Sequence, residues 1–508
     1  MFQSILMSKM NELSGVKTDE DYLKLPGFFT GYNGLDFYSS CLELGMNGYP
    51  IINGGVFPRL TNVIGGSAVG KTSLQVQCLG AAVDRLHRIY GPGYSELFFD
   101  DSENNSSPKR IMDLTGWTDA EFLSKCTFSQ KQKSLLDYAN KIMTIVDLKR
   151  KYRKDFLLPS GIKDVDGREV MFLAPTFFLV DSLPSINPNG IEQLISHDKA
   201  GDYKELERLG TNMDGATDAK AWTVFIRKIK PFLDEGNINF TVINHKVPGI
   251  QTDMYSMPEK VLPFLKPGEK PKGGSELIYQ SYMILDLQSK EKYNEFNPVY
   301  GSDVDGFAVK ATYVKNKNNV EGVGFQMVFD KAKGYLPEMG DFEYLFDKKY
   351  GFSGSPASMY LDILPEVHFT RKNLYNTCHE HPILARALSF TTKIRMGSEM
   401  LFKSPAPNLA NIAECRNINE RAGLICAFTE SYPRYTDLGI DLSDDLKRLE
   451  LDNRKYFLVD FDHNFNNSIP TSADMELSMR DEDTGVTYAG FTGNGLTPYD
   501  DLTDAIMD

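Results

Sequence analysis

Apolar runs separated by glycine-rich or charged stretches organise the first two thirds of this chain. Predicted strands cover residues 59–64 (RLTNVI), 95–100 (SELFFD), 176–181 (TFFLVD) and 238–247 (INFTVINHKV), and a predicted helix over 71–86 (KTSLQVQCLGAAVDRL) follows the first strand. The unbroken apolar run at 176–181 is typical of a strand that is buried on both faces, as in a parallel sheet. The pattern predicts an α/β fold with a mainly parallel central sheet.

The pattern changes toward the two ends of this core. A further extended stretch covers residues 306–330, and the insert 155–173 is predicted to form a hairpin around Asp166 and Gly167. The first 15 residues are amphipathic, because Ile5, Leu6, Met10 and Leu13 recur at helical spacing. We expect an N-terminal segment (1–49), a core (50–340), a small C-terminal domain (341–436) and an acidic extension (437–508).

The composition of the chain indicates the cellular compartment in which it works. The 508 residues are 41% hydrophobic, but no apolar run approaches the roughly 20 residues that a bilayer-spanning helix needs. The N-terminus lacks the cleavage site of a signal peptide, and the six cysteines lack the spacing of a metal site or a disulfide framework. These features predict a reducing, cytoplasmic compartment, which is the host cytoplasm if the chain is viral, and no membrane partner.

The net charge of −14 is concentrated at the C-terminal end. Residues 437–508 contain 17 Asp and Glu against 5 Lys and Arg, so the rest of the chain is nearly neutral. An acidic stretch interrupted by Gly and Asn is typical of a solvated tail. The alternative is a regulatory element that competes electrostatically for a basic surface.

A glycine-rich turn between a strand and a helix is the most specific motif. Gly65-x-x-x-x-Gly70-Lys71-Thr72 matches the phosphate-binding P-loop, in which backbone N–H groups and a helix N-terminus surround an anion. Lys71 would reach the outer phosphates and the Thr72 hydroxyl would bind Mg²⁺. The motif predicts nucleoside triphosphate binding by Gly65, Gly66, Ser67, Ala68, Val69, Gly70, Lys71, Thr72 and Ser73; a chance loop is the alternative.

Two carboxylates at predicted strand ends complete a candidate hydrolytic site. Asp181 follows the apolar run at 176–180 and is a candidate to orient Mg²⁺, although a carboxylate there could also cap a turn. Glu103, about thirty residues past the glycine-rich loop, is the candidate base for an attacking water. Its alternative is a solvated residue of a turn.

The stretch from Lys246 to Lys272 combines basic, aromatic and turn-forming residues. It contains five Lys, three acidic residues and five prolines, and its aromatic residues Tyr255 and Phe264 are isolated. A flexible loop of this composition is typical of single-stranded nucleic-acid binding. A lid or a protein-docking surface would fit the same composition.

Taken in order, these features resemble the RecA family of recombinases, most closely its phage UvsX-type members, over residues 48–340. The resemblance rests on six short segments in the family's order: the P-loop, DSE at 101–103 followed by Pro108, VDS at 180–182, INH at 243–245, GG at 273–274 and VKNK at 314–317. A fainter similarity to a helix of the UvsX-type C-terminal domain covers residues 379–390.

The resemblance implies that residues 1–49 form an oligomerisation segment that packs on a neighbouring subunit. It also implies roles for residues such as Lys315 and Lys317, which without it would be solvated strand residues. His245 would sense the terminal phosphate, and Lys315 and Lys317 would reach the nucleotide of the adjacent subunit. Arg110 takes the place of a tyrosine that stacks on adenine in many members, which leaves the nucleotide preference open. The family's first DNA-binding loop corresponds to residues 187–218. The second would contribute Tyr255, Lys260, Phe264, Lys266, Lys270, Lys272, Gly273 and Gly274.

The function expected from this resemblance is that of an ATP- and Mg²⁺-dependent recombinase. It would form a homo-oligomeric helical filament on single-stranded DNA and exchange strands with double-stranded DNA, with single-strand-binding and loader proteins as further candidate partners. Two alternatives share the same nucleotide chemistry. One is a RecA-fold motor such as a replicative helicase, and the other is a filament-forming or regulatory ATPase that does not act on DNA.

Overall fold

The structure is a computed structural model that describes most of residues 27–396. Within this range it leaves out residues 40, 45–49, 54, 132, 164–168, 184–185, 187–213, 249–259, 293–303, 320, 350, 363, 382–383, 386, 390 and 393–395. No helix of the described residues is long and apolar enough to cross a membrane.

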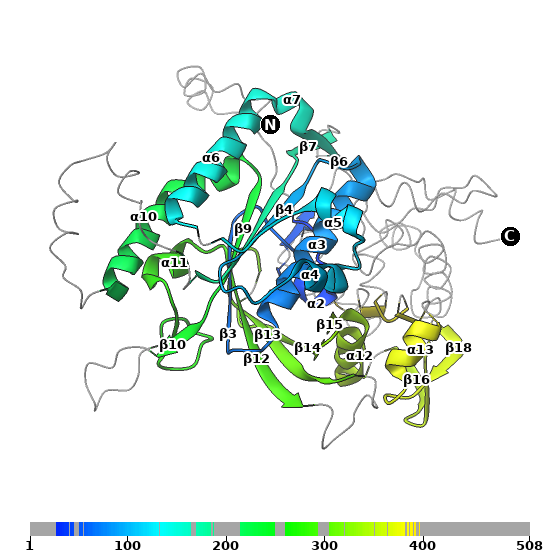
Figure 1. Cartoon of the computed structure of the whole chain (residues 1–508). Helices are drawn as coiled ribbons and strands as arrows, with labels where there is room; N and C mark the ends of the chain where they lie inside the picture. The colour runs from blue at the N-terminus through cyan, green and yellow to red at the C-terminus, as the bar shows by residue number, and fades with distance from the viewer. Residues whose placement is uncertain are drawn as a thin grey trace, which may run out of the picture.

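A nine-stranded sheet forms the centre of the protein (Figure 1). All neighbours from β12 to β5 are parallel, whereas β13, β14 and β15 add an antiparallel edge. The predicted α/β fold with a mainly parallel central sheet is therefore confirmed. In spatial order the strands are β15 (Gly334–Leu336), β14 (Gly324–Asp330), β13 (Gly306–Asn316), β12 (Met283–Lys292), β3 (Leu60–Gly65), β9 (Ile238–Ile243), β8 (Thr176–Asp181), β4 (Glu96–Asp101) and β5 (Cys126–Ser129).

Helices cover both faces of the sheet. One face packs against α3 (Lys71–Tyr90), α4 (Pro108–Thr115) and α5 (Asp119–Lys125), and the other packs against α6 (Leu135–Lys151), α10 (Asp214–Glu235) and α11 (Gly274–Gln280). Successive residues of β8 enter different cores, since Phe177 and Leu179 join the first and Phe178 and Val180 the second. This double burial explains the unbroken apolar run.

The described part of the expected N-terminal segment belongs to the core of its own chain. Phe28, Tyr32 and Leu35 are buried with the helices of the first face, and α2 (Asn33–Ser39) is fixed by polar bonds. The Asn33 side-chain amide donates to both carboxylate oxygens of Asp341, each at 3.0 Å. These apolar side chains gain free energy from burial in the core of the sheet's first face.

Smaller elements surround the sheet. The insert contains the antiparallel pair β6 (Leu157–Lys163) and β7 (Glu169–Leu173), preceded by α7 (Arg153–Phe156), so the predicted hairpin is confirmed. A second antiparallel pair, β1 (Cys41–Leu44) and β2 (Pro50–Asn53), follows α2.

The C-terminal part begins with a helix that the predicted boundary at residue 340 divides. This helix, α12 (Pro337–Lys348), contacts β14 and leads to the antiparallel strands β16 (Phe352–Ser355), β17 (Ser358–Leu361) and β18 (Leu364–Phe369) and to α13 (Leu374–Glu380). Phe342 of α12 packs against Phe352 and Phe369, so one helix serves both parts. The acidic extension (437–508) lies outside the described residues.

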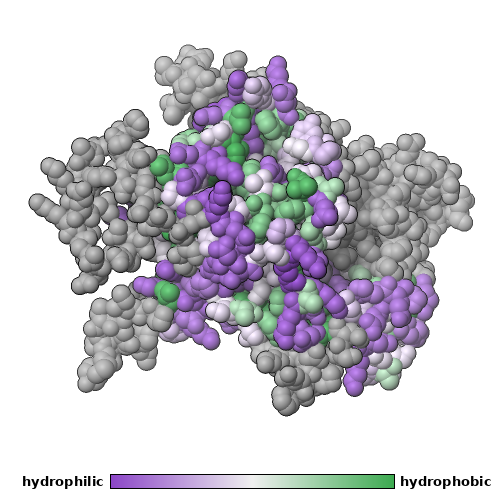
Figure 2. Space-filling view, viewed as in Figure 1, coloured by the Kyte–Doolittle hydropathy of each residue, from purple (hydrophilic) through white to green (hydrophobic). Residues whose placement is uncertain are grey.

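Hydrophilic side chains cover most of the described surface on the face shown in Figure 2, with separate hydrophobic patches between them.

Candidate functional site

Four of the predicted site segments meet at one edge of the sheet. The glycine-rich loop follows β3. Asp101 is the last residue of β4 and Glu103 lies just after it, Asp181 is the last residue of β8, and His245 lies just after β9. These strands are mutually parallel, so their carboxyl ends lie together, which is where open α/β sheets bind ligands. The structure thus brings together residues that are up to 180 positions apart in the sequence.

The glycine-rich loop has a tight backbone that its glycines permit. Ala68 and Gly70 have positive φ angles of 57° and 77°, and Gly70 caps α3. A Cβ on Gly70 would lie 2.6 Å from the ring of Phe329, and one on Gly65 would lie 2.6 Å from the carbonyl oxygen of Leu287. Both positions therefore require glycine. Gly70 requires it because of its positive φ angle and its close neighbours, and Gly65 requires it because of its close neighbour alone.

Lys71 lies inside the curve of this loop at the start of α3. Its ammonium group donates to the carbonyl oxygens of Gly66 at 2.6 Å and Gly65 at 3.3 Å. Burial lowers the pKa of Lys71, and the nearby carboxylates of Asp181 and Glu103 oppose that shift. A buried cation beside the N-terminus of a 20-residue helix fits the phosphates of a nucleotide.

Thr72 and Asp181 form the oxygen pair expected for magnesium. The Thr72 hydroxyl donates to the Asp181 carboxylate, which is only 4% exposed. Burial raises the pKa of Asp181 to about 6; Glu103 and Asp101 add to the shift, and the bond from Thr72 and the charge of Lys71 oppose it.

Hydroxyl and carboxylate oxygens suit Mg²⁺, which takes few protein ligands beside substrate phosphates. The described residues contain no group of three or more His, Cys, Asp or Glu that could hold a metal by itself. Thr72 and Asp181 offer two oxygen ligands of the kind that Mg²⁺ takes.

Glu103 is surrounded by polar groups at the same edge. One of its carboxylate oxygens, Oε1, accepts from the Ser182 hydroxyl and lies 3.7 Å from His245 Nε2. The other accepts from the Asn105 side-chain amide at 3.0 Å. Sequence reasoning selected Glu103 and His245 but gave no role to Ser182, the last residue of the VDS segment, or to Asn105, two residues after Glu103.

An ion cluster beside His245 was not predicted. The ammonium group of Lys246 lies 3.1 Å from Asp286 and 3.2 Å from Glu269. Asp286 is fully buried on β12, next to the strand that precedes the glycine-rich loop. An acid within the apolar run of residues 283–287 was the available signal, because a buried carboxylate needs a cation.

The predicted second DNA loop is partly structured. Its ends form the antiparallel pair β10 (Lys246–Pro248) and β11 (Glu269–Pro271), and Leu262 and Leu265 are buried in a small core. Phe264, expected in a flexible loop, packs over Gly322 while remaining 46% exposed.

The structure describes most of the other residues predicted to bind DNA. Lys260, Lys266 and Lys272 are exposed, Lys270 is half-buried, and Gly273 and Gly274 begin α11. Tyr255 and most of the predicted first DNA loop lie outside the described residues.

Lys315 and Lys317 lie at the opposite edge of the sheet, away from the glycine-rich loop of their own chain. In the register of the sheet, Lys315 is opposite Ile284, and Ile284 pairs with Asn62 near the start of β3. The Lys315 ammonium donates to the carbonyl oxygens of Ile278 and Tyr279 at 2.6 and 2.7 Å. Burial, followed by repulsion from Lys317, lowers the pKa of Lys315 to about 8.

Arg110 is also bound locally. Its guanidinium group donates to the carbonyl oxygens of Lys331, at 3.1 Å, and Ala332. These carbonyls belong to the turn before β15, whose Tyr335 hydroxyl donates to Val69 of the glycine-rich loop at 2.7 Å. Arg110 therefore borders the loop through this turn.

No protein-family model matches this chain, and no curated protein matches it either.

Proposed function

We propose that this chain is a DNA-dependent ATPase that acts as a RecA-like recombinase. It would polymerise on single-stranded DNA as a helical filament and pair that strand with a homologous duplex. One observation carries the proposal: the glycine-rich loop, the Thr72–Asp181 pair and the Glu103–His245 pair share one sheet edge. His245 leads directly into the β10–β11 stem of the basic loop.

Each residue of this edge has a distinct part in the proposed hydrolysis. Lys71 and the backbone N–H groups of the loop would hold the phosphates, and Thr72 and Asp181 would hold Mg²⁺. Bound Mg²⁺ would neutralise charge on the phosphate oxygens. Glu103 Oε1 would accept the proton of the attacking water, and Ser182 and Asn105 would fix the direction of the carboxylate.

The same edge suggests how the nucleotide state would reach DNA. His245 lies between Glu103, at 3.7 Å, and the stem of the basic loop, and Lys246 ties that stem to Asp286 in the central sheet. A change in hydrogen bonding at His245 would therefore alter the stem directly. Tyr255, Phe264 and the loop lysines would contact the bases and phosphates of the strand.

The experiment combines Glu103→Gln with electron microscopy. Glu103→Gln should bind ATP and hydrolyse it at least about a hundredfold more slowly, which is the scale of a lost general base. Glu96→Gln, at the other end of β4, is the matched control and should keep normal turnover. Negative-stain images of Glu103→Gln with ATP and single-stranded DNA should show open helical filaments.

Three results would count against the proposal. Normal turnover of Glu103→Gln would remove this residue from the site. Closed rings would favour a RecA-fold motor such as a helicase, and assembly that ignores DNA would favour an ATPase without DNA chemistry.

A further inference from the structure

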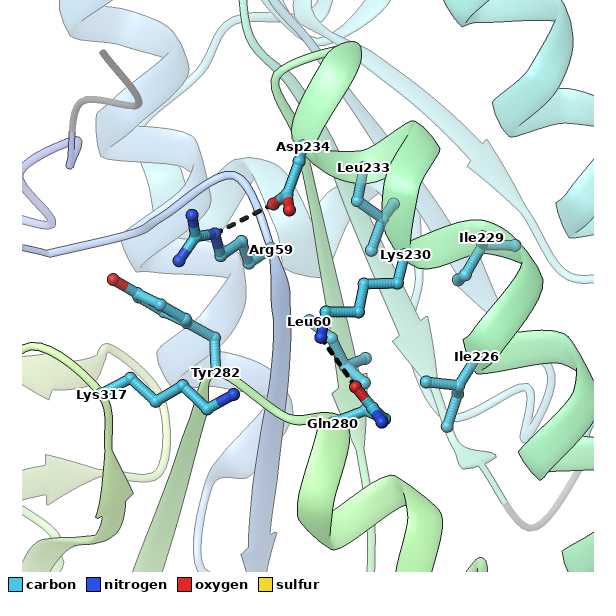
Figure 3. Close-up of a pocket in the computed structure, with 10 residues that line it drawn as sticks. All are labelled: Arg59, Leu60, Ile226, Ile229, Lys230, Leu233, Asp234, Gln280, Tyr282 and Lys317. Carbon is cyan, nitrogen blue, oxygen red and sulfur yellow. Dashed lines mark hydrogen bonds and ion pairs between the residues drawn. The ribbon is translucent and has the colours of Figure 1, made fainter. Parts of the chain in front are cut away.

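A pocket of about 240 Å³ opens at the edge of the sheet opposite the candidate site. Figure 3 shows its two unlike sides. Apolar side chains of α10 and β3 line one side, namely Ile226, Ile229, Leu233 and Leu60. Arg59, Tyr282 and Lys317 line the other, and Lys230, Asp234 and Gln280 complete the lining.

Positive charge dominates the lining. Arg59, Lys230 and Lys317 face a single acid, Asp234, which binds Arg59 at 2.9 Å. Lys230 donates to the Gln280 side-chain oxygen at 2.8 Å, and among the described residues no hydrogen-bond partner is found for the Lys317 ammonium. Partial burial and repulsion from Lys230 and Arg59 lower the pKa of Lys317, so an incoming anion would relieve this repulsion. The pocket fits an acidic group joined to an apolar side chain.

The described chain begins close to this pocket. Phe28 forms an antiparallel bridge with Val56, through two backbone hydrogen bonds of 2.7 Å. Val56 stands three residues before Arg59 of the pocket lining, so Phe28 lies within a few residues' length of the pocket. The segment just before Phe28 includes residues 19–25 (DEDYLKL), in which three successive acids precede Tyr22 and Leu23.

We propose that residues 19–25 dock into the pocket of their own chain. Asp19, Glu20 and Asp21 face Lys230 and Lys317, and Tyr22 and Leu23 cover the apolar side. A tether of only a few residues from Phe28 gives the segment a high effective concentration at its own pocket, which favours this contact over one between subunits. The docked segment covers Lys317, so it restrains any contact that this lysine makes with another subunit.

Cysteine cross-linking of the full-length chain tests the docking without any measure of ATPase activity. The variant Tyr22→Cys/Gln280→Cys is treated with a short bis-maleimide, and the linked peptides are identified by mass spectrometry. We expect an intramolecular link whose yield does not change over a tenfold range of protein concentration. Of the six native cysteines, Cys78, Cys126 and Cys378 are buried, and each single-cysteine variant measures the background links formed by the other native cysteines.

Charge changes in the same background show whether the contact is specific. Lys230→Glu/Lys317→Glu should slow the link at least about tenfold, which corresponds to about 1.4 kcal/mol. Adding Asp19→Lys, Glu20→Lys and Asp21→Lys should restore it. Lys228→Glu, on α10 but not in the lining, is the matched control and should leave the rate unchanged.

Two outcomes overturn the proposal. A link that is indifferent to both charge reversals shows that the segment meets the pocket only by chance encounters. A link that joins two chains and rises with concentration shows that the occupant comes from a second copy. Restoration by the reversed acids excludes misfolding of Lys230→Glu/Lys317→Glu as the reason for a lost link.

Discussion

The two edges of the central sheet carry opposite kinds of polar chemistry. At the carboxyl ends of the parallel strands, the glycine-rich loop and the N-terminus of α3 face the acids Asp101, Glu103 and Asp181. At the amino ends, lysines meet backbone carbonyls. Lys315 binds two carbonyls in the last turn of α11, and Lys149 binds Gly236 just after α10 at 2.7 Å.

This difference follows from the direction of the chain. In a parallel α/β fold, each helix begins near the carboxyl ends of the strands and ends near their amino ends. Helix N-termini carry positive partial charge and unpaired N–H groups, whereas helix C-termini carry negative partial charge and unpaired carbonyls. The first edge is therefore suited to bind phosphates, and the second attracts cations. Lys315 lies at the second edge, so it is remote from the glycine-rich loop of its own chain.

The largest expected effect tests whether the cationic edge serves a neighbour. Replacing both Lys315 and Lys317 with Ala should lower DNA-stimulated ATP turnover about 10³-fold, the lower end of the range for arginine fingers, because each lysine offers a single point charge. Nucleotide binding by the isolated subunit should be unchanged. Turnover is measured with and without single-stranded DNA.

An experiment that mixes two variants shows whether Lys315 and Lys317 act on a neighbouring subunit or only stabilise α11 of their own chain. The double variant has an intact glycine-rich loop, and Lys71→Ala has an intact cationic edge. Co-assembled mixtures should recover part of the activity, since each subunit supplies what the other lacks. Mixtures that co-assemble yet stay as inactive as their parents would show that Lys315 and Lys317 do not act between subunits.

An intermediate effect concerns the stability of the cationic edge. Lys149 is 4% exposed and donates to the carbonyl oxygens of Ala174 and Gly236 at 2.6 and 2.7 Å. Lys149→Met should lower the free energy of unfolding by about 2–4 kcal/mol, because two buried carbonyls lose their donor. Lys151→Met, an exposed change on the same helix, should stay within about 0.5 kcal/mol of wild type. Denaturant titration measures both.

The pH dependence of the same pair of proteins has a definite sign. Burial lowers the pKa of Lys149 to about 7, below the ordinary value that the unfolded chain retains. Between pH 7 and about 10 the unfolded state therefore binds the extra proton, so this group adds stability as pH rises. The stability difference between wild type and Lys149→Met should widen over this range; a constant difference would contradict the lowered pKa.

Local pattern predicted the strands and the loop conformation of the first edge. The apolar run at 176–181 matches β8 in full, and the predicted helix at 71–86 is the first four fifths of α3. These features succeed because each is encoded within about twenty neighbouring residues, by burial of a strand or by glycine at a tight turn.

Contacts between distant segments could not be predicted in this way. The pair Lys246–Asp286 depends on β12 lying beside β3, an order that no local pattern contains. The partners of Lys315 are carbonyls of a helix some 36 residues away, so composition suggested only a solvated lysine. Phe264 was assigned to a flexible loop because the prolines of residues 246–272 indicated one. The apolar residues Leu262 and Leu265, which are buried in a small core, were given no weight.

The smallest expected effect separates the exposed aromatic residues of the two edges. Phe264 of the basic loop is 46% exposed, and Tyr279 beside Lys315 is 69% exposed. If the loop binds single-stranded DNA, Phe264→Ala should weaken binding by about 1–3 kcal/mol, the contribution of one base stacked on an aromatic ring. Tyr279→Ala should leave subunit affinity for a short oligonucleotide unchanged, because its edge is not the proposed DNA side. Fluorescence anisotropy at low protein concentration measures both affinities. Equal losses of affinity in the two variants would contradict the assignment of DNA binding to the basic loop.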